Sequence, residues 1–274
     1  MNIKGKAAVV TGAGGGGSGR AIARRLARDG AQVVVSDIDE EGALKTVEAI
    51  TAEGGRALSF RADVKNESEI KALIALAEKQ YGGLDILVNN ASGPGYHPEA
   101  PLEYWFETVQ TDLFGTLYAT RHAIDAMHKR GGGAIVNIGS TSALAHGRLH
   151  SGGSPAYDVA KAGAIRLTTM LAWLGQHEKI RVSCLVPDWV ASPDVKAYFD
   201  SLAPEQRGKD GIPETLTTLD EIADAVAALI TNDALAGRVL VLWTGKPAGL
   251  IPVGDPGYTA LEGWPPEGSK LVAP

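Results

Sequence analysis

A glycine-rich loop between a short apolar run and a helical pattern is the feature that most limits how this chain can fold. Residues 7–10 are apolar and predict a buried strand, residues 12–19 are mostly glycine, and apolar residues then recur at helical spacing. Without side chains, the backbone N–H groups of such a loop can approach a pyrophosphate at the helix N-terminus. The order strand, loop, helix therefore predicts a dinucleotide site, whose loop residues are Gly12, Gly16, Gly17, Ser18 and Gly19.

Strand and helix patterns continue to alternate along the chain. Strands are expected at residues 32–36, 56–61 and 84–88, with helices at 39–53 and 67–80 between them. This alternation at short spacing predicts an α/β fold, a doubly wound parallel sheet with helices on both faces. In such sheets ligands bind beyond the carboxyl ends of the strands. No internal repeat or domain boundary is visible.

Asp37 ends the second predicted strand, close to the position about 20 residues beyond the glycine loop where dinucleotide-binding sequences place an acid. There the carboxylate can accept hydrogen bonds from the adenosine ribose and would repel a 2′-phosphate. This favours NAD over NADP. The alternative is a solvated loop acid, or the cap of the helix that starts near Asp39.

Tyr157 and Lys161 are four residues apart in a helical pattern, so they lie on one face with about 6 Å of rise between them. A phenol holds its proton at neutral pH, and a neighbouring cation favours the phenolate. The pair can therefore serve as a general acid/base. The alternative is a ring that packs against the core and a lysine that is solvated.

Charge and composition narrow the class of partner. The chain has 274 residues, a formal charge of −6 and no long basic run, which argues against nucleic acid or an anionic membrane. No apolar stretch approaches the ~20 residues of a membrane span, so we expect a cytoplasmic protein. Cys184 is the single cysteine and is expected in the core, and His146 and His150 lack companions at metal-ligand spacing. A small-molecule substrate and no metal are expected.

Four motifs together resemble the short-chain dehydrogenase/reductase family. They are Thr11-Gly12 with its glycine loop, Asn89-Asn90-Ala91-Ser92, Ser140, and Tyr157-x-x-x-Lys161, and the resemblance covers roughly residues 3–245. It implies a single Rossmann-like domain with a sheet of about seven strands. It also implies an NAD-dependent oxidoreductase that interconverts a secondary alcohol and a ketone, and a homotetramer.

The resemblance also assigns roles by position. Tyr157 matches the acid/base of the family, Lys161 the residue that favours the phenolate and holds the nicotinamide ribose, and Ser140 the hydroxyl that steadies the substrate oxygen. Further positions match cofactor contacts: Asp63 and Val64 at the adenine, and Asn90 and Val190 elsewhere along the dinucleotide.

The chain departs from the family pattern in several places. The glycine loop is longer by one residue, and the segment 145–154 is also longer than usual. Pro187-Asp188 replaces the usual Pro-Gly. Asp112 stands where an asparagine is common. If ionised near Lys161, Asp112 would stabilise the ammonium and oppose phenolate formation, and we expect the repulsion to dominate; the alternative is that Asp112 only bonds local backbone and water.

The segments outside the nucleotide-binding pattern divide the chain further. Residues 1–248 are expected to form the Rossmann-like catalytic domain, with a mobile substrate lid at 192–213 and a helix capped by Asp220 after it. Residues 249–274 are predicted to be a Pro/Gly-rich tail. Trp264 in that tail is expected to cover apolar surface on a neighbouring subunit or over the cleft.

The substrate cannot be chosen from the sequence. Six side chains are candidates to line its pocket: Tyr96, His97, Leu149, Trp189, Tyr198 and Phe199. Two other functions stay open. One is a non-redox enzyme on the same scaffold, such as a dehydratase or an epimerase, and the other is an NAD-binding sensor without turnover.

Overall fold

A computed structural model describes residues 1–93, 98–144, 154–209 and 211–254. Its centre is an eight-stranded sheet in the order β3-β2-β1-β4-β5-β6-β7-β8. The strands are β1 (Ala7–Thr11), β2 (Gln32–Asp37), β3 (Arg56–Arg61), β4 (Ile86–Asn89), β5 (Gly133–Ile138), β6 (Ile180–Pro187), β7 (Val239–Leu242) and β8 (Gly249–Leu250). The first seven are parallel, which confirms the predicted sheet, and β8 adds a short antiparallel edge.

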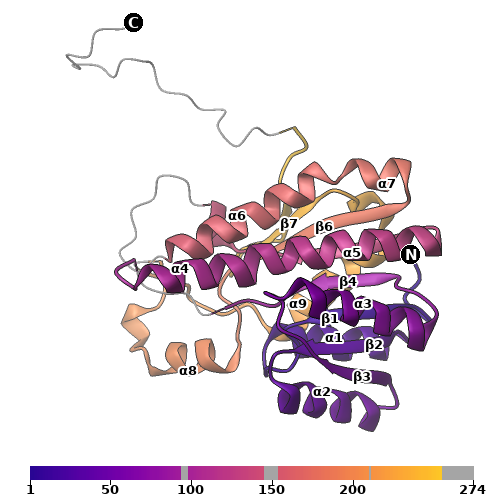
Figure 1. Ribbon diagram of the computed structural model, residues 1–274. Coiled ribbons are helices and arrows are strands. Elements are labelled where there is room, and N and C mark those ends of the chain that lie inside the picture. Colours follow the sequence, from indigo (N-terminus) through magenta and orange to yellow (C-terminus); the bar gives the residue numbers. More distant parts are fainter. Residues whose placement is uncertain (94–97, 145–153, 210, 255–274) are drawn as a thin grey trace, which may run out of the picture.

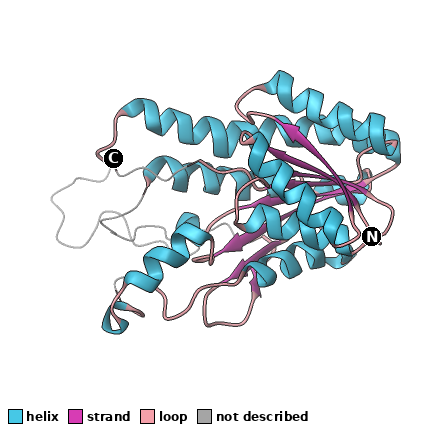
Figure 2. Cartoon of the chain, turned by 90° about the horizontal axis from the view of Figure 1, so that it is seen from below, coloured by secondary structure: helices cyan, strands magenta, loops and turns pink. Residues whose placement is uncertain are grey.

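Helices cover both faces of this sheet (Figures 1 and 2). They are α1 (Ser18–Arg28), α2 (Glu40–Ala52), α3 (Glu67–Tyr81), α4 (Leu102–Val109), α5 (Gly115–Arg130), α6 (Pro155–Met170), α7 (Trp173–His177), α8 (Pro193–Ser201) and α9 (Leu219–Thr231). One core lies between the sheet and α1, α2 and α9, and another between the sheet and α3 and α5. The single-domain α/β prediction is therefore confirmed.

The apolar runs of the central strands follow from burial on both faces. In β1, Ala8 and Val10 face the α1 side, whereas Val9 faces the α3 side. Successive side chains of a strand point to opposite faces, so a strand covered on both sides needs apolar residues at every position. Because β1–β7 are parallel, the polar residues that follow these strands all lie at one edge of the sheet.

A five-residue π-helix (Gln110–Phe114) joins α4 to α5, so the two helices form one nearly continuous rod (Figure 1). Asp112 lies within it and is buried, with 1% of its surface exposed. A π-turn carries one extra residue in the helix, and such turns are frequent at functional sites. Asp112 therefore points into the protein from the irregular part of this rod.

The structure corrects one sequence-based expectation and adds detail to two others. Thr218, not Asp220, caps α9: its hydroxyl accepts from Glu221 N at 3.2 Å, while Glu221 accepts from Thr218 N at 2.7 Å. The predicted lid contains α8 and a short turn at Pro204–Gln206. The sheet also extends through β8 into the predicted tail, whose residues 255–274, with Trp264, lie outside the described residues.

Candidate active site

Asn90 ties the glycine loop to the end of β4. Its side-chain amide donates to Thr11 O at 3.0 Å and Gly12 O at 2.9 Å, and its backbone N–H donates to Thr11 Oγ1 at 3.1 Å. Gly12 has φ +63°, and a Cβ there would lie 2.6 Å from Ala91 Cα. Glycine is therefore required at this point, since a side chain would force the loop away from β4.

The rest of the loop leads into the N-terminus of α1. Gly17 occupies the N-cap position without a side-chain cap, and the first turn contains no acid. Its backbone N–H groups are therefore available for an anion. Gly16 and Gly17 border a hollow of about 360 Å³, with Ala191 and the start of α9 on its other side. A chain of phosphates fits this setting, because Gly16 and Gly17 have no side chain to stand in the way.

Asp37 is held by backbone groups at the end of β2. One carboxylate oxygen accepts from Gly14 N at 2.7 Å and the other from Asp39 N at 3.0 Å. Asp39 itself occupies the N-cap position of α2, so the reading of Asp37 as the helix cap is wrong. Each carboxylate oxygen can accept a second hydrogen bond, which leaves room for ribose hydroxyls.

Tyr157 and Lys161 lie in the first turns of α6, which begins with Pro155 at a position where proline is favoured. The Lys161 ammonium is 5.3 Å from the centroid of the Tyr157 ring. It also donates to Ile138 O at the end of β5, at 3.2 Å. Lys161 is only 3% exposed, so the alternative of a solvated lysine is wrong.

A buried ion pair joins Lys161 to Asp112, with 3.0 Å between Nζ and Oδ1. Asp112 also accepts from the Ser92 hydroxyl, and from Gly93 N at 2.9 Å. Burial lowers the pKa of Lys161, but the carboxylate of Asp112 and the phenol of Tyr157 outweigh it and leave that pKa above its ordinary value. Lys161 is therefore an ammonium at neutral pH. The reading in which Asp112 bonds only local backbone and water is wrong.

Ser140 follows β5 and faces the same edge of the sheet. Its Oγ lies 2.9 Å from Ser142 Oγ and accepts from Ser142 N at 3.3 Å. The turn Thr141–Leu144 packs against α6, the helix that carries Tyr157. The structure thus brings the ends of β4 and β5, the π-helix and α6 to one place.

The remaining predicted cofactor residues also follow strands. Asp63 Oδ1 accepts from Lys65 N at 2.9 Å, and Val64 packs against the start of α5 at Gly115. Val190 forms a β-bridge with Thr217 beyond the end of β6. All three lie at the carboxyl edge of the sheet.

Three of the six predicted pocket residues, Trp189, Tyr198 and Phe199, lie in the part of the chain that the structure describes. Tyr198 is 52% exposed, and its ring lies 6.1 Å from that of Trp189. Phe199 is buried beneath the Arg207 guanidinium, so it packs within the segment 192–213 itself. The others, Tyr96, His97, Leu149 and the neighbouring His146 and His150, lie outside the described residues.

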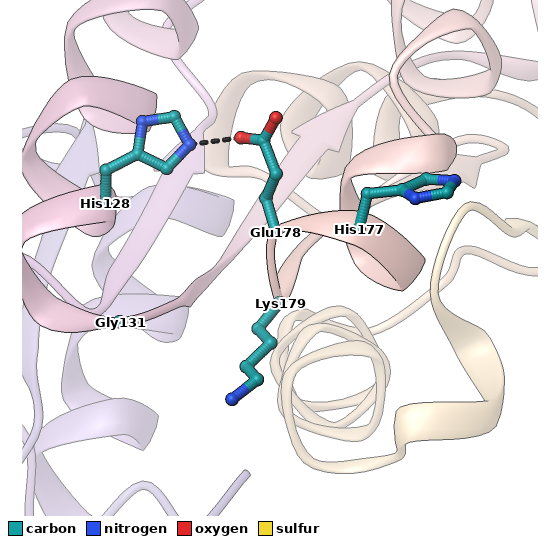
Figure 3. A pocket seen from close by; sticks show the side chains of 5 residues that line it. All are labelled: His128, Gly131, His177, Glu178 and Lys179. Atoms are coloured by element: carbon teal, nitrogen blue, oxygen red, sulfur yellow. Dashed lines mark hydrogen bonds and ion pairs between the residues drawn. The ribbon is translucent and has the colours of Figure 1, made fainter.

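Cys184 is fully buried on β6, as expected. Burial raises the pKa of its thiol to about 12. His122 and His128 lie on the surface of α5, where they contact Glu67 and Glu178. A hollow of about 350 Å³ lies beside His128, at the end of α5 remote from the π-helix. Figure 3 shows the side chains that line it.

Two features are absent from the described residues. No group of three or more His, Cys, Asp or Glu side chains is arranged there to hold a metal ion. None of the helices in this part of the chain combines the length and apolar character that a bilayer crossing requires.

Sequence reasoning missed Ser92, Thr141 and Thr244 as members of the polar network at this edge. Ser92 could have been found, because it closes the Asn89-Asn90-Ala91-Ser92 motif and its hydroxyl bonds Asp112. Thr141 and Thr244 both donate to Asp188, at 3.2 Å and 2.8 Å. No sequence pattern connects Thr141 with Thr244, since one follows β5 and the other follows β7, about 100 residues later.

The fold and the site define a dinucleotide-binding α/β protein, and comparison with known proteins gives its family. A family model described as short chain dehydrogenase matches residues 6–202, more than half of the chain. The chain belongs to the short-chain dehydrogenase/reductase family of oxidoreductases, which bind nicotinamide cofactors.

Individual relatives cover nearly the whole chain. Cis-4-hydroxycyclohexanecarboxylate dehydrogenase of Sinomonas cyclohexanicum is 34% identical over 93% of this chain and 97% of its own. The 7α-hydroxysteroid dehydrogenase of Escherichia coli is 34% identical over 89% and 95%. A solved 7α-hydroxysteroid dehydrogenase, complexed with NADH and 7-oxo glycochenodeoxycholic acid, superposes with a TM-score of 0.78 at 30% identity, over 89% of this chain and 96% of that one.

Proposed function

We propose that this protein is an NAD-dependent oxidoreductase that interconverts a secondary alcohol and a ketone by hydride transfer, with Tyr157 as the acid/base. The observation that carries the proposal is the buried Lys161 ammonium beside the Tyr157 ring, at 5.3 Å from its centroid. A cation held in a site without solvent favours the phenolate more strongly than one in water. Tyr157 can then take the proton of an alcohol or return it to a ketone oxygen.

Lys161 and Asp112 prepare the site for this proton transfer. The carboxylate keeps the ammonium charged despite its burial, and the bond from Lys161 to Ile138 O fixes the ammonium relative to β5. Ser92 and Gly93 donate to the same carboxylate and so fix Asp112. Charges that are already oriented need no rearrangement during the reaction.

Ser140 steadies the substrate oxygen in this proposal. Its hydroxyl is paired with that of Ser142, so it has a defined orientation and can still donate to a substrate oxygen. Bound NAD supplies the hydride acceptor for alcohol oxidation. Positioning the substrate oxygen between Ser140 and Tyr157 orients the carbon that exchanges the hydride.

We assign NAD rather than NADP because Asp37 stands at the end of β2 and contacts the glycine loop through Gly14 N, at 2.7 Å. A fixed carboxylate at that position would repel a 2′-phosphate. The proposed cofactor-binding residues are Gly12, Gly16, Gly17, Ser18, Gly19, Asp37, Asp63, Val64, Asn90, Tyr157, Lys161 and Val190.

A cyclic secondary alcohol is the substrate class we propose. The names of the two relatives above each describe a hydroxyl group on a ring. A homotetramer is the proposed assembly, supported by large apolar side chains that are exposed on α4, the π-helix, α6 and α7. These are Phe106, Phe114, Val159, Met170 and Trp173. Large apolar side chains that gather on an exposed surface mark protein–protein contacts.

The deciding experiment incubates the protein with NAD and a panel of cyclic secondary alcohols and follows the absorbance of NADH. The proposal expects one NADH for each ketone formed. Conversion of an alcohol without net NADH would indicate a dehydratase or an epimerase. NADH binding without any turnover across the panel would indicate a sensor.

A further inference from the structure

Asp188 follows β6 and connects the ends of three neighbouring strands. Its Oδ1 accepts from Thr141 Oγ1 at 3.2 Å, three residues beyond the end of β5 at Ile138. Its Oδ2 accepts from Thr244 N at 3.3 Å and from Thr244 Oγ1 at 2.8 Å, beyond the end of β7. The strand order β5-β6-β7 places Asp188 between these two threonines.

Beyond the strand ends, hydrogen bonds from the Asp188 side chain replace the backbone hydrogen bonds that join the strands. Gly139 N donates to Leu185 O at 2.8 Å, one residue beyond β5, and Asp188 N donates to Leu242 O at 2.9 Å. Past this point the Asp188 carboxylate accepts the hydrogen bonds from the residues that follow β5 and β7. A carboxylate has about four acceptor sites, and neutral hydroxyl and amide donors occupy three of them here.

Thr141 is bonded covalently to Ser140, so whatever fixes Thr141 limits where the Ser140 hydroxyl can be. Thr141 is 7% exposed and begins the tight turn Thr141–Leu144, in which Ala143 N donates to Ser140 O at 3.1 Å. A shift or rotation of this turn would move Ser140 Oγ relative to Tyr157 on α6. A displacement of about 1 Å in a catalytic group can cost on the order of 10² in rate.

We infer that Asp188 is a positioning residue that holds the Ser140 turn in register with α6 through Thr141. The inference rests on the proposed function, because it assumes that Ser140 acts on the substrate oxygen. Asp188 acts by hydrogen-bond geometry and not by its charge, since all its contacts are neutral donors.

The charge can be removed while the contacts are kept. In Asp188→Asn the amide oxygen can face Thr244, and the amide N–H can donate to Thr141 Oγ1, because a hydroxyl accepts as well as donates. Asp188→Ala removes both sets of contacts. Thr141→Val removes the link toward Ser140 from its other end and leaves the carboxylate in place.

The test is a double-mutant cycle with Ser140→Ala, measured as kcat for alcohol oxidation and as NADH affinity. We expect Asp188→Ala and Thr141→Val to lower kcat by roughly 10- to 100-fold with NADH affinity unchanged. In the Ser140→Ala background, Asp188→Ala should cost less than about twofold, because its effect passes through Ser140. Asp188→Asn should restore most of the activity.

Asp85→Asn is the matched control. Asp85 is also a buried carboxylate that joins strands, since it accepts from Ala7 N at 2.9 Å and pairs with Lys6 and Arg130, but it precedes β4 at the opposite edge of the sheet. Its variant should lose stability and keep kcat. A loss of kcat in Asp85→Asn as large as that in Asp188→Ala would overturn the inference, because general destabilisation would then explain both.

Two other results would overturn the inference and spare the proposed function. One is a full loss from Asp188→Ala in the Ser140→Ala background, and the other is wild-type kcat in Asp188→Ala. Equal losses of kcat in Asp188→Asn and Asp188→Ala would also overturn the inference, because they would indicate that Asp188 acts through its charge and not through its hydrogen bonds. If Ser140→Ala itself keeps wild-type turnover, the role proposed for Ser140 fails as well.

Discussion

Asp112 and Lys161 form an ion pair of 3.0 Å from which solvent is almost wholly excluded, with side-chain exposures of 0% and 4%. Removing one partner of a buried pair leaves the other charge without compensation, which costs about 3–5 kcal/mol. The Lys161 ammonium of this pair also lies 5.3 Å from the centroid of the Tyr157 ring. In the proposed mechanism, stability and proton transfer therefore depend on the same carboxylate.

Replacing Asp112 by asparagine tests this coupling. Removing a negative charge makes the Tyr157–Lys161 pair release its first proton at lower pH. We expect Asp112→Asn to remain active, with the midpoint of its pH–rate profile for alcohol oxidation shifted to lower pH. It should also unfold more readily, because one side of the amide must face a donor, either Gly93 N or the Lys161 ammonium. A midpoint that is unchanged or raised would contradict electrostatic coupling.

Tyr157→Phe keeps the aromatic ring and removes the exchangeable proton. Turnover should fall by roughly 10² to 10⁴, the usual contribution of a positioned acid/base, while NADH affinity measured by fluorescence stays nearly constant. Tyr81→Phe, at the end of α3, is the control and should have wild-type kinetics. Near-normal turnover in Tyr157→Phe would remove Tyr157 from the mechanism.

Asp37→Ala tests cofactor choice. It should weaken NAD binding by roughly 1.5–3 kcal/mol, the value of charge-assisted hydrogen bonds, and reduce the discrimination against NADP. Because Asp37 also holds Gly14 N and Asp39 N, the thermal midpoint should be recorded beside the dissociation constants. Asp37→Asn separates the two effects, since it keeps an acceptor and removes the charge. A wild-type protein that prefers NADP would sink the assignment.

The Cys184 thiol gives a probe of folding. Burial raises its pKa to about 12, whereas a thiol in an unfolded chain ionises near 8.5. The native thiol should therefore not react with a thiol reagent at pH 8, and denaturant should expose it. Between pH 8.5 and 12 the unfolded state alone loses this proton, so stability should fall as pH rises. Cys184→Ala should show a shallower alkaline loss in urea titrations, and an equal slope would argue against the shift.

Much of the fold follows from local pattern. Residues 7–10 of β1 and 33–35 of β2 are apolar because helices cover both faces of the sheet, and Gly12 is required where the loop approaches β4 closely. The sequence alone does not distinguish Thr218 from Asp220 as the cap of α9, because both are good capping residues. The choice depends on Glu221, which completes the reciprocal pair with Thr218.

The sequence by itself determined the positions of the central strands, the glycine loop and the shared helix face of Tyr157 and Lys161, because each depends on residues only a few positions apart. Only the tertiary structure decided that Lys161 is buried against Asp112, and that Asp188 joins Thr141 to Thr244. Those contacts link distant segments, and their geometry depends on strand order and on the π-helix at Gln110–Phe114. No local periodicity carries that information, since the energy of a buried charge depends on every group packed around it.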